Sequence, residues 1–182
     1  MSSPLILPAL TGDAVRLRAF TTADLPVVRE AALDPLIPLI TSVPAGGDDD
    51  ACLAYIARQA DRLTHGVGYS FAIADGATDG PVGQIGLWLH DLRHGRVSTG
   101  YWVARPHRGR GLAADALLAL SRWAVGLPGV ARVELYVEPA NTASRRTAQR
   151  AGFAEEGLLR SWQRVGDERR DMTMYSLLAP GH

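Results

Sequence analysis

A loop rich in glycine and arginine separates an expected strand from an expected helix, and its residues are suited to binding an anion. The loop runs from Arg108 to Ala113 as Arg-Gly-Arg-Gly-Leu-Ala. The first N–H groups of a helix have no intrahelical acceptor, and the helix dipole adds positive charge there. Gly109 and Gly111 let the backbone approach a ligand because they carry no Cβ, while Arg108 and Arg110 add charge. We therefore predict a pyrophosphate site at this loop.

Two other interpretations of the loop stay open. The arginines could simply be solvated at the start of a helix. The run from Gly109 to Ala114 also matches the G-x-G-x-x-A fingerprint of dinucleotide-binding folds, with Glu134 at a suitable distance. That fingerprint normally follows its strand directly, whereas Pro106-His107-Arg108 intervene here, and the chain after Ala151 lacks the further strand–helix–strand units that such a fold needs.

Several motifs in the same order resemble one family. Arg108 to Ala113 matches the (Gln/Arg)-x-x-Gly-x-(Gly/Ala) acyl-CoA signature of the GNAT superfamily of N-acetyltransferases. Gly100-Tyr-Trp-Val103, Asn141-Thr-Ala-Ser144, Ala151-Gly-Phe153 and Asp171-Met-Thr-Met-Tyr175 are similar to that family as well. The resemblance extends from about Asp13 to Leu178, and it is strongest to the branch that contains the ribosomal-protein N-terminal acetyltransferases.

The resemblance implies acetyl-CoA as cosubstrate and suggests which residues bind it. Main-chain N–H groups of the loop would hold the pyrophosphate, and the strand ending at Val103 would separate from the strand 132–137 to admit the pantetheine arm. The Val103 N–H would bond the acetyl carbonyl. Asn141 would bond the pantetheine, although asparagine is also a preferred N-cap for the helix that follows. The residues implied for cofactor binding are Trp102, Val103, Arg108, Gly109, Arg110, Gly111, Leu112, Ala113 and Asn141.

The expected general acid departs from the commonest pattern of the family. Many members place a tyrosine seven residues after the asparagine, where this chain has Ala148. Ser144 lies one helical turn before that position and on the same face, so we predict that Ser144 protonates the leaving thiolate. Its alternative role is to help cap the helix. Arg145, Arg146 and Arg150 could reach the 3′-phosphate of CoA or form a solvated helix face.

A weak base is sufficient if the acceptor is an α-amine. An α-amine has a pKa of about 7.7–8, against about 10.4 for lysine, so a useful fraction is already neutral at pH 7. Glu134, Tyr136 and Glu138 share one face of their expected strand. Glu138 stands at the end of that strand and is the first candidate for the base, the alternative being an ordinary solvated glutamate.

The pattern of apolar residues places these groups on a mixed sheet. Strands are predicted at 13–20, 68–74, 81–90, 96–104, 130–137, 153–165 and 170–178, and helices at 22–33, from 48 onward, at 111–125 and at 141–151. Short turns imply antiparallel neighbours, whereas the unit 96–137 should be a right-handed parallel crossover. The segment 34–47 is expected to be a loop. The predicted fold is α+β, a single mixed and mostly antiparallel sheet flanked by helices, in one domain covering residues 1–182.

The predicted helix that begins at residue 48 has an expected apolar stripe of Leu53, Ile56, Ala60 and Leu63. The resemblance implies that the first two helices wall the acceptor side, and here they lie in the half of the chain that carries an excess of acidic residues. Residues 1–91 hold 5 arginines and 11 acids, and residues 92–182 hold 14 arginines and 8 acids. An acidic wall would attract a cationic amine, with helix capping as the alternative role of residues 48–50. The candidates for this wall are Asp34, Asp48, Asp49, Asp50 and Asp61.

Composition excludes several other classes. All 19 basic residues are arginine, so a Walker P-loop and a Schiff-base or pyridoxal enzyme are excluded. The formal net charge of zero argues against nucleic acid or a membrane surface as partner, and no apolar stretch approaches the roughly 18 residues of a membrane span. His90-Asp-Leu-Arg-His94 falls at an expected turn rather than on a helix, so no metal site is predicted.

The single cysteine, Cys52, excludes a disulfide framework and fits a reducing cytoplasm. Met1 to Leu10 lacks a basic leader and is not expected to be a signal peptide.

The expected function is direct acetyl transfer from acetyl-CoA, within a ternary complex, to the primary amine of a protein N-terminus or small molecule. A larger donor such as succinyl-CoA and a non-catalytic acyl-CoA-binding module are the alternatives. A homodimer is one expected assembly, although the sequence does not determine the oligomeric state.

Overall fold

The structure, a computed structural model, describes residues 5–181. The first four residues of Met1 to Leu10, considered above for a signal peptide, lie outside this range. The strands are β1 (Leu10–Thr11), β2 (Val15–Arg18), β3 (Gly68–Asp75), β4 (Pro81–Trp88), β5 (Arg96–Val103), β6 (Arg132–Val137), β7 (Ala154–Val165) and β8 (Glu168–Leu178). The α-helices are α1 (Leu25–Ala32), α2 (Ile37–Ile40), α3 (Asp49–Thr64), α4 (Leu112–Ala124) and α5 (Thr142–Arg150).

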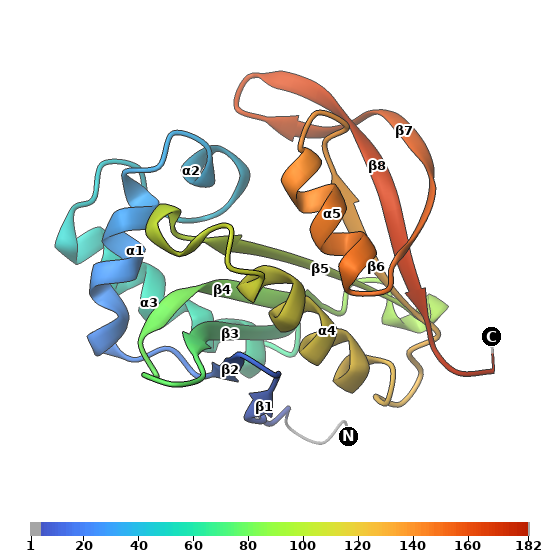
Figure 1. Cartoon of the computed structure of the whole chain (residues 1–182), viewed down its shortest axis with the longest axis horizontal. Coiled ribbons are helices and arrows are strands. Elements are labelled where there is room, and N and C mark those ends of the chain that lie inside the picture. Colours follow the sequence, from blue (N-terminus) through green and yellow to red (C-terminus); the bar gives the residue numbers. More distant parts are fainter. Residues whose placement is uncertain (1–4, 182) are drawn as a thin grey trace.

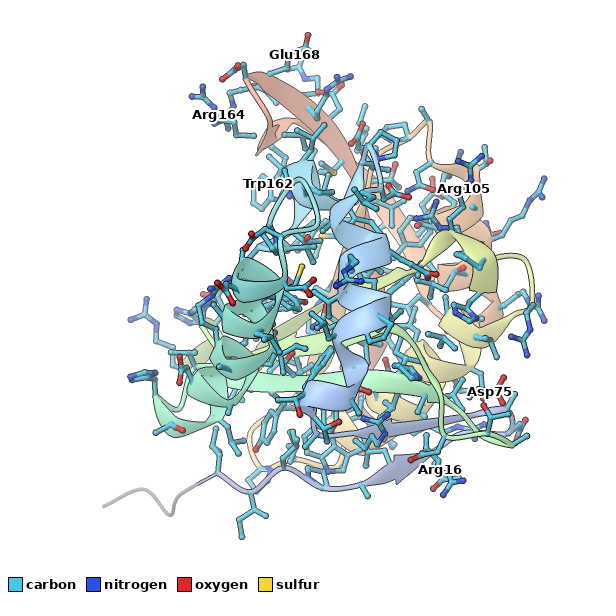
Figure 2. All side chains as sticks on the ribbon, turned by 90° about the vertical axis from the view of Figure 1, so that its left-hand side faces the viewer. Arg16, Asp75, Arg105, Trp162, Arg164 and Glu168 are labelled. Atoms are coloured by element: carbon cyan, nitrogen blue, oxygen red, sulfur yellow. The ribbon has the colours of Figure 1, made fainter. Side chains whose placement is uncertain are left out.

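All eight strands form one sheet, in the order β1-β2-β3-β4-β5-β6-β8-β7 (Figure 1). The pair β5–β6 is parallel, and the other neighbours are antiparallel. The predicted mixed sheet and the parallel connection through a helix are therefore confirmed. The hairpin β7–β8 extends beyond the helices, and its tip, marked by Arg164 and Glu168, lies at the opposite end of the molecule from Arg16 and Asp75 (Figure 2).

Among the strands and α-helices of residues 5–181, two short elements were not predicted. Strand β1 has only two residues, too few for a recognisable alternation. Helix α2 forms inside the segment expected to be a loop, and its start is stabilised by the Asp34 carboxylate, which accepts the N–H groups of Leu36 at 2.9 Å and Ile37 at 3.2 Å. Because α2 is a single turn containing Pro38, its sequence carries no helical periodicity.

The sheet carries an apolar core on each face. One core holds α4 and includes Phe71, Leu117 and Leu120. The other holds α1 and α3 and includes Val28 and Trp102. Neighbouring residues along a strand point to opposite faces of the sheet. The central strands are therefore buried on both sides, and their ends reach the candidate site.

The buried face of α3 differs from the predicted stripe. Of the predicted stripe, Ile56 is buried, Leu53 and Leu63 are half-buried and Ala60 is exposed, whereas Cys52, Tyr55 and Gln59 are buried without having been predicted. The apolar pattern did not predict the burial of Gln59, because this side chain is polar. Its amide forms hydrogen bonds inside the protein: Nε2 donates to the Tyr55 carbonyl at 2.7 Å, and Oε1 accepts from the Ser70 hydroxyl at 2.9 Å. Burial and the nearby Asp49 raise the pKa of the Cys52 thiol, as expected for a packed thiol.

Helix α4 is tied to the β1–β2 turn by Asp115. Its carboxylate accepts the main-chain N–H groups of Asp13 at 3.0 Å, Ala14 at 2.7 Å and Val15 at 3.0 Å. Asp115→Ala should lower the free energy of unfolding by about 2 kcal/mol, because three donors lose a charged acceptor in a partly exposed place. Urea denaturation measures this, with Asp115→Asn as control, since it keeps one acceptor oxygen and should lose less. Equal losses in both variants would show that only the charge of Asp115 matters.

Candidate active site

A row of unpaired donors marks the loop before α4. In the part of the chain that the structure describes, the main-chain N–H groups of residues 109–113 donate to no protein acceptor. Gly109 and Gly111 have φ values of +78° and +80°, in the left-handed region that glycine adopts without strain. These two glycines turn the chain so that consecutive N–H groups meet the N-terminus of α4. The geometry suits an anion with several oxygens.

The arginine side chains of the loop already form hydrogen bonds and ion pairs within the protein. Arg108 donates to the Val103 carbonyl at 2.8 Å and to the Asp34 carboxylate at 2.7 Å, while Arg110 pairs with Asp75 at 2.8 Å. Burial alone would raise the pKa of Asp34, but the N–H groups that cap α2 and the Arg108 guanidinium outweigh it and lower that pKa. The two side chains therefore brace the loop.

Positive charge reaches the loop from α5 instead. Arg146 and Arg150 line the same cavity as the loop, and the Arg150 guanidinium lies 3.6 Å from the place that a Cβ on Gly111 would occupy. The Arg145 guanidinium is held by Tyr175 at 3.0 Å and Glu155 at 3.3 Å. Of these three arginines, Arg146 and Arg150 are thus the ones in position to meet phosphate.

The predicted separation of two strands is present. β5 and β6 pair from Arg96↔Arg132 to Thr99↔Leu135, and beyond Thr99 β5 stays paired with β4 alone. The Ala104 N–H donates to Val82 at 3.0 Å, and bonding directions alternate along an antiparallel strand. The Val103 N–H therefore points away from β4, into the gap left by β6.

Two cavities meet at this gap. The loop cavity, of about 430 Å³, lies between the loop, the start of α4 and α5. The sheet cavity, of about 470 Å³, lies over β4, β5 and β6. Tyr101, Asn141 and Ser144 line both cavities, together with Ile40 of α2 and Leu36, the N-cap of that helix. A reaction between one ligand in each cavity would take place beside these residues.

Helix α5 positions Asn141 and Ser144. Asn141 is its N-cap, and the side-chain oxygen accepts the Ser144 N–H at 3.0 Å. Ala148, at the position where a tyrosine was considered, is fully buried, so its place faces the core. Burial raises the pKa of Tyr101, which the neighbouring Ser144 and Thr147 hydroxyls oppose. Tyr101 thus joins Ser144 as a hydroxyl at the meeting point.

The three candidates for the base differ in their surroundings. Glu134 is buried and already bound, by the Tyr136 hydroxyl at 2.7 Å and by Arg132 at 3.0 Å. Burial and Glu134 raise the pKa of Tyr136, which disfavours its anion. Glu138 lines the sheet cavity, and its carboxylate forms no hydrogen bond or ion pair with residues 5–181. Glu138 is therefore the carboxylate available to a ligand.

The predicted acidic wall does not form, since none of its five aspartates lines the sheet cavity. Asp34 binds Arg108, Asp48 caps α3 by accepting the Ala51 N–H at 2.8 Å, and Asp49 pairs with Arg29. Asp48 and Asp49 lie at the N-terminus of α3, where acidic side chains stabilise a helix, and Asp34 stabilises the start of α2. The cavity instead meets α3 at Tyr55 and Arg62, which are seven residues apart on one side of the helix. Tyr55, Gln59 and Arg62 lie at helical spacing, a signal that the apolar stripe concealed.

A family model described as an acetyltransferase (GNAT) domain matches residues 14–154. The match includes the loop, both strands of the gap and α5. The protein belongs to the GNAT acetyltransferase family. Within residues 5–181 of this GNAT protein, no helix combines the length and apolar character needed to cross a membrane. In the same range, no three His, Cys, Asp or Glu side chains group to hold a metal ion.

Individual relatives agree with the family. Uncharacterized N-acetyltransferase p20 of Bacillus licheniformis is 28% identical over 172 residues, which are 94% of this chain and 97% of that protein. The ribosomal-protein-serine acetyltransferase of Escherichia coli (strain K12) is 25% identical over 118 residues, 65% of this chain and 66% of that one. The solved structure of Mycobacterium smegmatis RimJ in complex with CoA-disulfide has a TM-score of 0.75 at 26% identity, covering 97% of this chain and 88% of that one. The predicted resemblance to the ribosomal-protein branch of GNAT enzymes is thereby confirmed.

Asn141 offers a test of whether this GNAT protein uses its helix cap to bind the cosubstrate. Asn141→Ala should weaken acetyl-CoA binding about tenfold and lower the free energy of unfolding by about 1 kcal/mol, because both a ligand bond and a cap are lost. Asn141→Asp keeps an acceptor for the Ser144 N–H and serves as control. Calorimetric titration and urea denaturation separate the two effects. A loss of stability with unchanged affinity would leave Asn141 as a cap only.

Proposed function

We propose that the protein transfers an acetyl group from acetyl-CoA to the primary amine of a protein N-terminus or a small molecule, by direct attack in a ternary complex. One observation carries the proposal. The free N–H groups of residues 109–113 lead along the loop cavity to the Val103 N–H, and that cavity meets the sheet cavity at Ser144. A long anionic donor and a separate acceptor can thus be held with their reactive ends together.

The residues present fit an acyl-CoA. The five free N–H groups of residues 109–113, with Arg146 and Arg150, would hold its phosphates, and Trp102 and Val103 would lie along the pantetheine in the gap. The Val103 N–H would stabilise the negative charge that develops on the acetyl oxygen. The bound acetyl-CoA would supply the activated acetyl group. The main chain thus supplies most of the binding contacts, and the side chains of Arg108 and Arg110 keep the loop in shape.

Ser144 and Glu138 take the proton-transfer roles. Glu138 would accept a proton from the acceptor ammonium, directly or through water, so that the amine attacks the carbonyl carbon. As the new C–N bond forms and the C–S bond breaks, Ser144 would donate a proton to the leaving sulfur. The surplus proton of the attacking nitrogen returns through water to Ser144, which restores its hydroxyl, and Glu138 releases its proton to solvent, so one proton is set free per turnover. Ser144 is placed between the two cavities, as this role requires.

A panel of donors and acceptors tests the proposal. CoA release would be measured with acetyl-CoA and succinyl-CoA as donors and with peptides, amino acids and polyamines as acceptors. We expect release that depends on both acetyl-CoA and an amine. If CoA were released faster from succinyl-CoA than from acetyl-CoA, succinyl-CoA would be the donor in place of acetyl-CoA. Acetyl-CoA binding without release for any acceptor would support a non-catalytic acyl-CoA-binding module instead.

The domain organisation, the location and the assembly of the protein are further proposals. We propose that residues 1–182 work as one domain, because both cores are built on one sheet. The buried free thiol of Cys52 supports the cytoplasm as location, which cell fractionation checks. Leu158 and Trp162 are exposed on the β7–β8 hairpin, which supports a homodimer. Light scattering of the purified protein measures its mass.

A further inference from the structure

The sheet cavity contains one cationic and one acidic side chain. Of the residues that line it, Arg62 alone is basic and Glu138 alone is acidic. Glu138 follows β6 beside the gap, close in sequence to Asn141, which borders the loop cavity. Arg62 approaches from the C-terminal half of α3, on the sheet face that carries Trp88 and Gln84. The cavity therefore offers two different charges from two different elements.

The charge of Arg62 has no partner in the described part of the chain. No carboxylate forms an ion pair with it, and its Nη1 is shielded from solvent without a hydrogen bond. The guanidinium carbon lies 5.1 Å from the centre of the Trp88 ring, a cation–π contact that orients the group without neutralising it. Burial lowers the pKa of Arg62. An uncompensated, largely buried cation is costly, and a bound anion would offset that cost.

The sheet beneath Arg62 is cleared of side chains. Gly86 and Gly100 face each other across β4 and β5. A Cβ on Gly86 would lie 3.1 Å from both the Arg62 Nη1 and the Trp88 ring, and one on Gly100 would lie 3.4 Å from that ring. The two glycines thus let Arg62 and Trp88 lie flat on the sheet. Arg62 is thereby held in place as part of the cavity floor.

The neighbouring polar groups are already paired, so they do not compensate Arg62. The Gln84 amide donates to Ser70 at 3.1 Å, and Ser70 donates to Gln59 at 2.9 Å. The Tyr55 hydroxyl accepts from Trp102 at 3.2 Å, and burial raises its pKa to about 12. Tyr55 therefore stays neutral at physiological pH, and Arg62 keeps its full charge for a ligand.

We propose that the amine acceptor also carries a carboxylate, which Arg62 binds in the sheet cavity while the amine lies toward Glu138 and Ser144. This rests on the proposed function and names its substrate class: an aminocarboxylate, either a free amino acid-like molecule or the first residues of a peptide with an acidic side chain. A guanidinium matches a carboxylate in shape and charge. One cation balances one such group, whereas a phosphate would bring about two charges near pH 7.

The test compares matched acceptors at saturating acetyl-CoA. Linear ω-amino acids are set against their amides, and peptides beginning with aspartate against those beginning with asparagine. We expect kcat/KM at least about tenfold higher for the carboxylate member of a pair. The set in which this preference appears identifies the source of the carboxylate. Phosphate-bearing amines form a third set, and a preference for them over carboxylates would overturn the proposal.

Arg62→Gln should remove the preference. We expect the KM for carboxylate acceptors to rise at least about tenfold while the KM for amides changes little, and Arg62→Lys should restore part of the difference. Arg58→Gln is the matched control, because Arg58 lies on α3, is exposed and lines neither cavity. Circular dichroism melting of each variant checks folding.

The outcomes separate the two proposals. Acetyl transfer with equal kcat/KM for carboxylates and amides, or an equal loss for both in Arg62→Gln, would overturn the role of Arg62 and leave the proposed function standing. An enzyme that binds acetyl-CoA and acetylates no amine would overturn the proposed function, and this inference with it. A KM effect confined to carboxylates supports both.

Discussion

Gly111→Val is expected to reduce acetyl-CoA affinity by at least about 100-fold. Gly111 has φ +80°, a region that a β-branched residue almost never adopts. Its side chain would project toward the Arg150 guanidinium, 3.6 Å from the Cβ position, into the space where a phosphate would lie between loop and helix. The variant would thus displace the N–H groups of the loop and occupy the ligand's place. Calorimetric titration with acetyl-CoA measures the loss.

The control for Gly111→Val must separate backbone strain from loss of the site. Gly46 also has a positive φ, +97°, with nothing within 4 Å of its Cβ position, and it lines neither cavity. Gly46→Val should lower the free energy of unfolding without changing acetyl-CoA affinity. If Gly111→Val bound acetyl-CoA normally, the phosphate site would have to lie elsewhere.

Ser144→Ala should lower kcat about 100-fold with less than a threefold change in the KM for acetyl-CoA. Proton donation to the leaving sulfur acts in the transition state, so its loss affects turnover rather than binding. The substitution leaves the cap of α5 intact, because Asn141 bonds the main-chain N–H of Ser144 rather than its hydroxyl. Steady-state kinetics at saturating amine gives both parameters.

Thr142→Ala is the matched control for Ser144→Ala. It removes a hydroxyl from the same helical turn, at an exposed residue that lines neither cavity, and kcat should not change. An unaltered kcat in Ser144→Ala would reduce Ser144 to a structural residue. Tyr101→Phe would then test the other hydroxyl at the junction of the cavities.

The two predictions divide the site into binding and chemistry. Gly111 acts through the main chain of the loop, so its replacement should abolish affinity while a folded protein remains. Ser144 acts through a side chain at the point where the cavities meet, so its replacement should spare affinity. A single variant that changed both quantities equally would indicate a general distortion of α5 and the loop.

Local sequence determined the parts of the site that depend on neighbours along the chain. The left-handed turns at Gly109 and Gly111, the start of α4 after them and the cap at Asn141 follow from residue types within a few positions. The alternation along β5 and β6 likewise predicted the strands and the shared face of Glu134, Tyr136 and Glu138. These features rest on backbone sterics and short-range hydrogen bonds, which a single sequence reveals.

Tertiary structure decided which charges are free. Arg108 and Arg110 look available in the sequence, but Asp34 and Asp75, distant along the chain, neutralise them. Of the aspartates expected at the acceptor side, Asp34, Asp48 and Asp49 bind arginines or cap a helix, and Arg62 faces the sheet cavity without a carboxylate. Ion pairs between distant residues depend on how helices pack across the sheet. The chain's local pattern therefore predicted the turns and free N–H groups of the loop, and only the packing of α3 on the sheet decided that Arg62 is the basic residue that lines the sheet cavity.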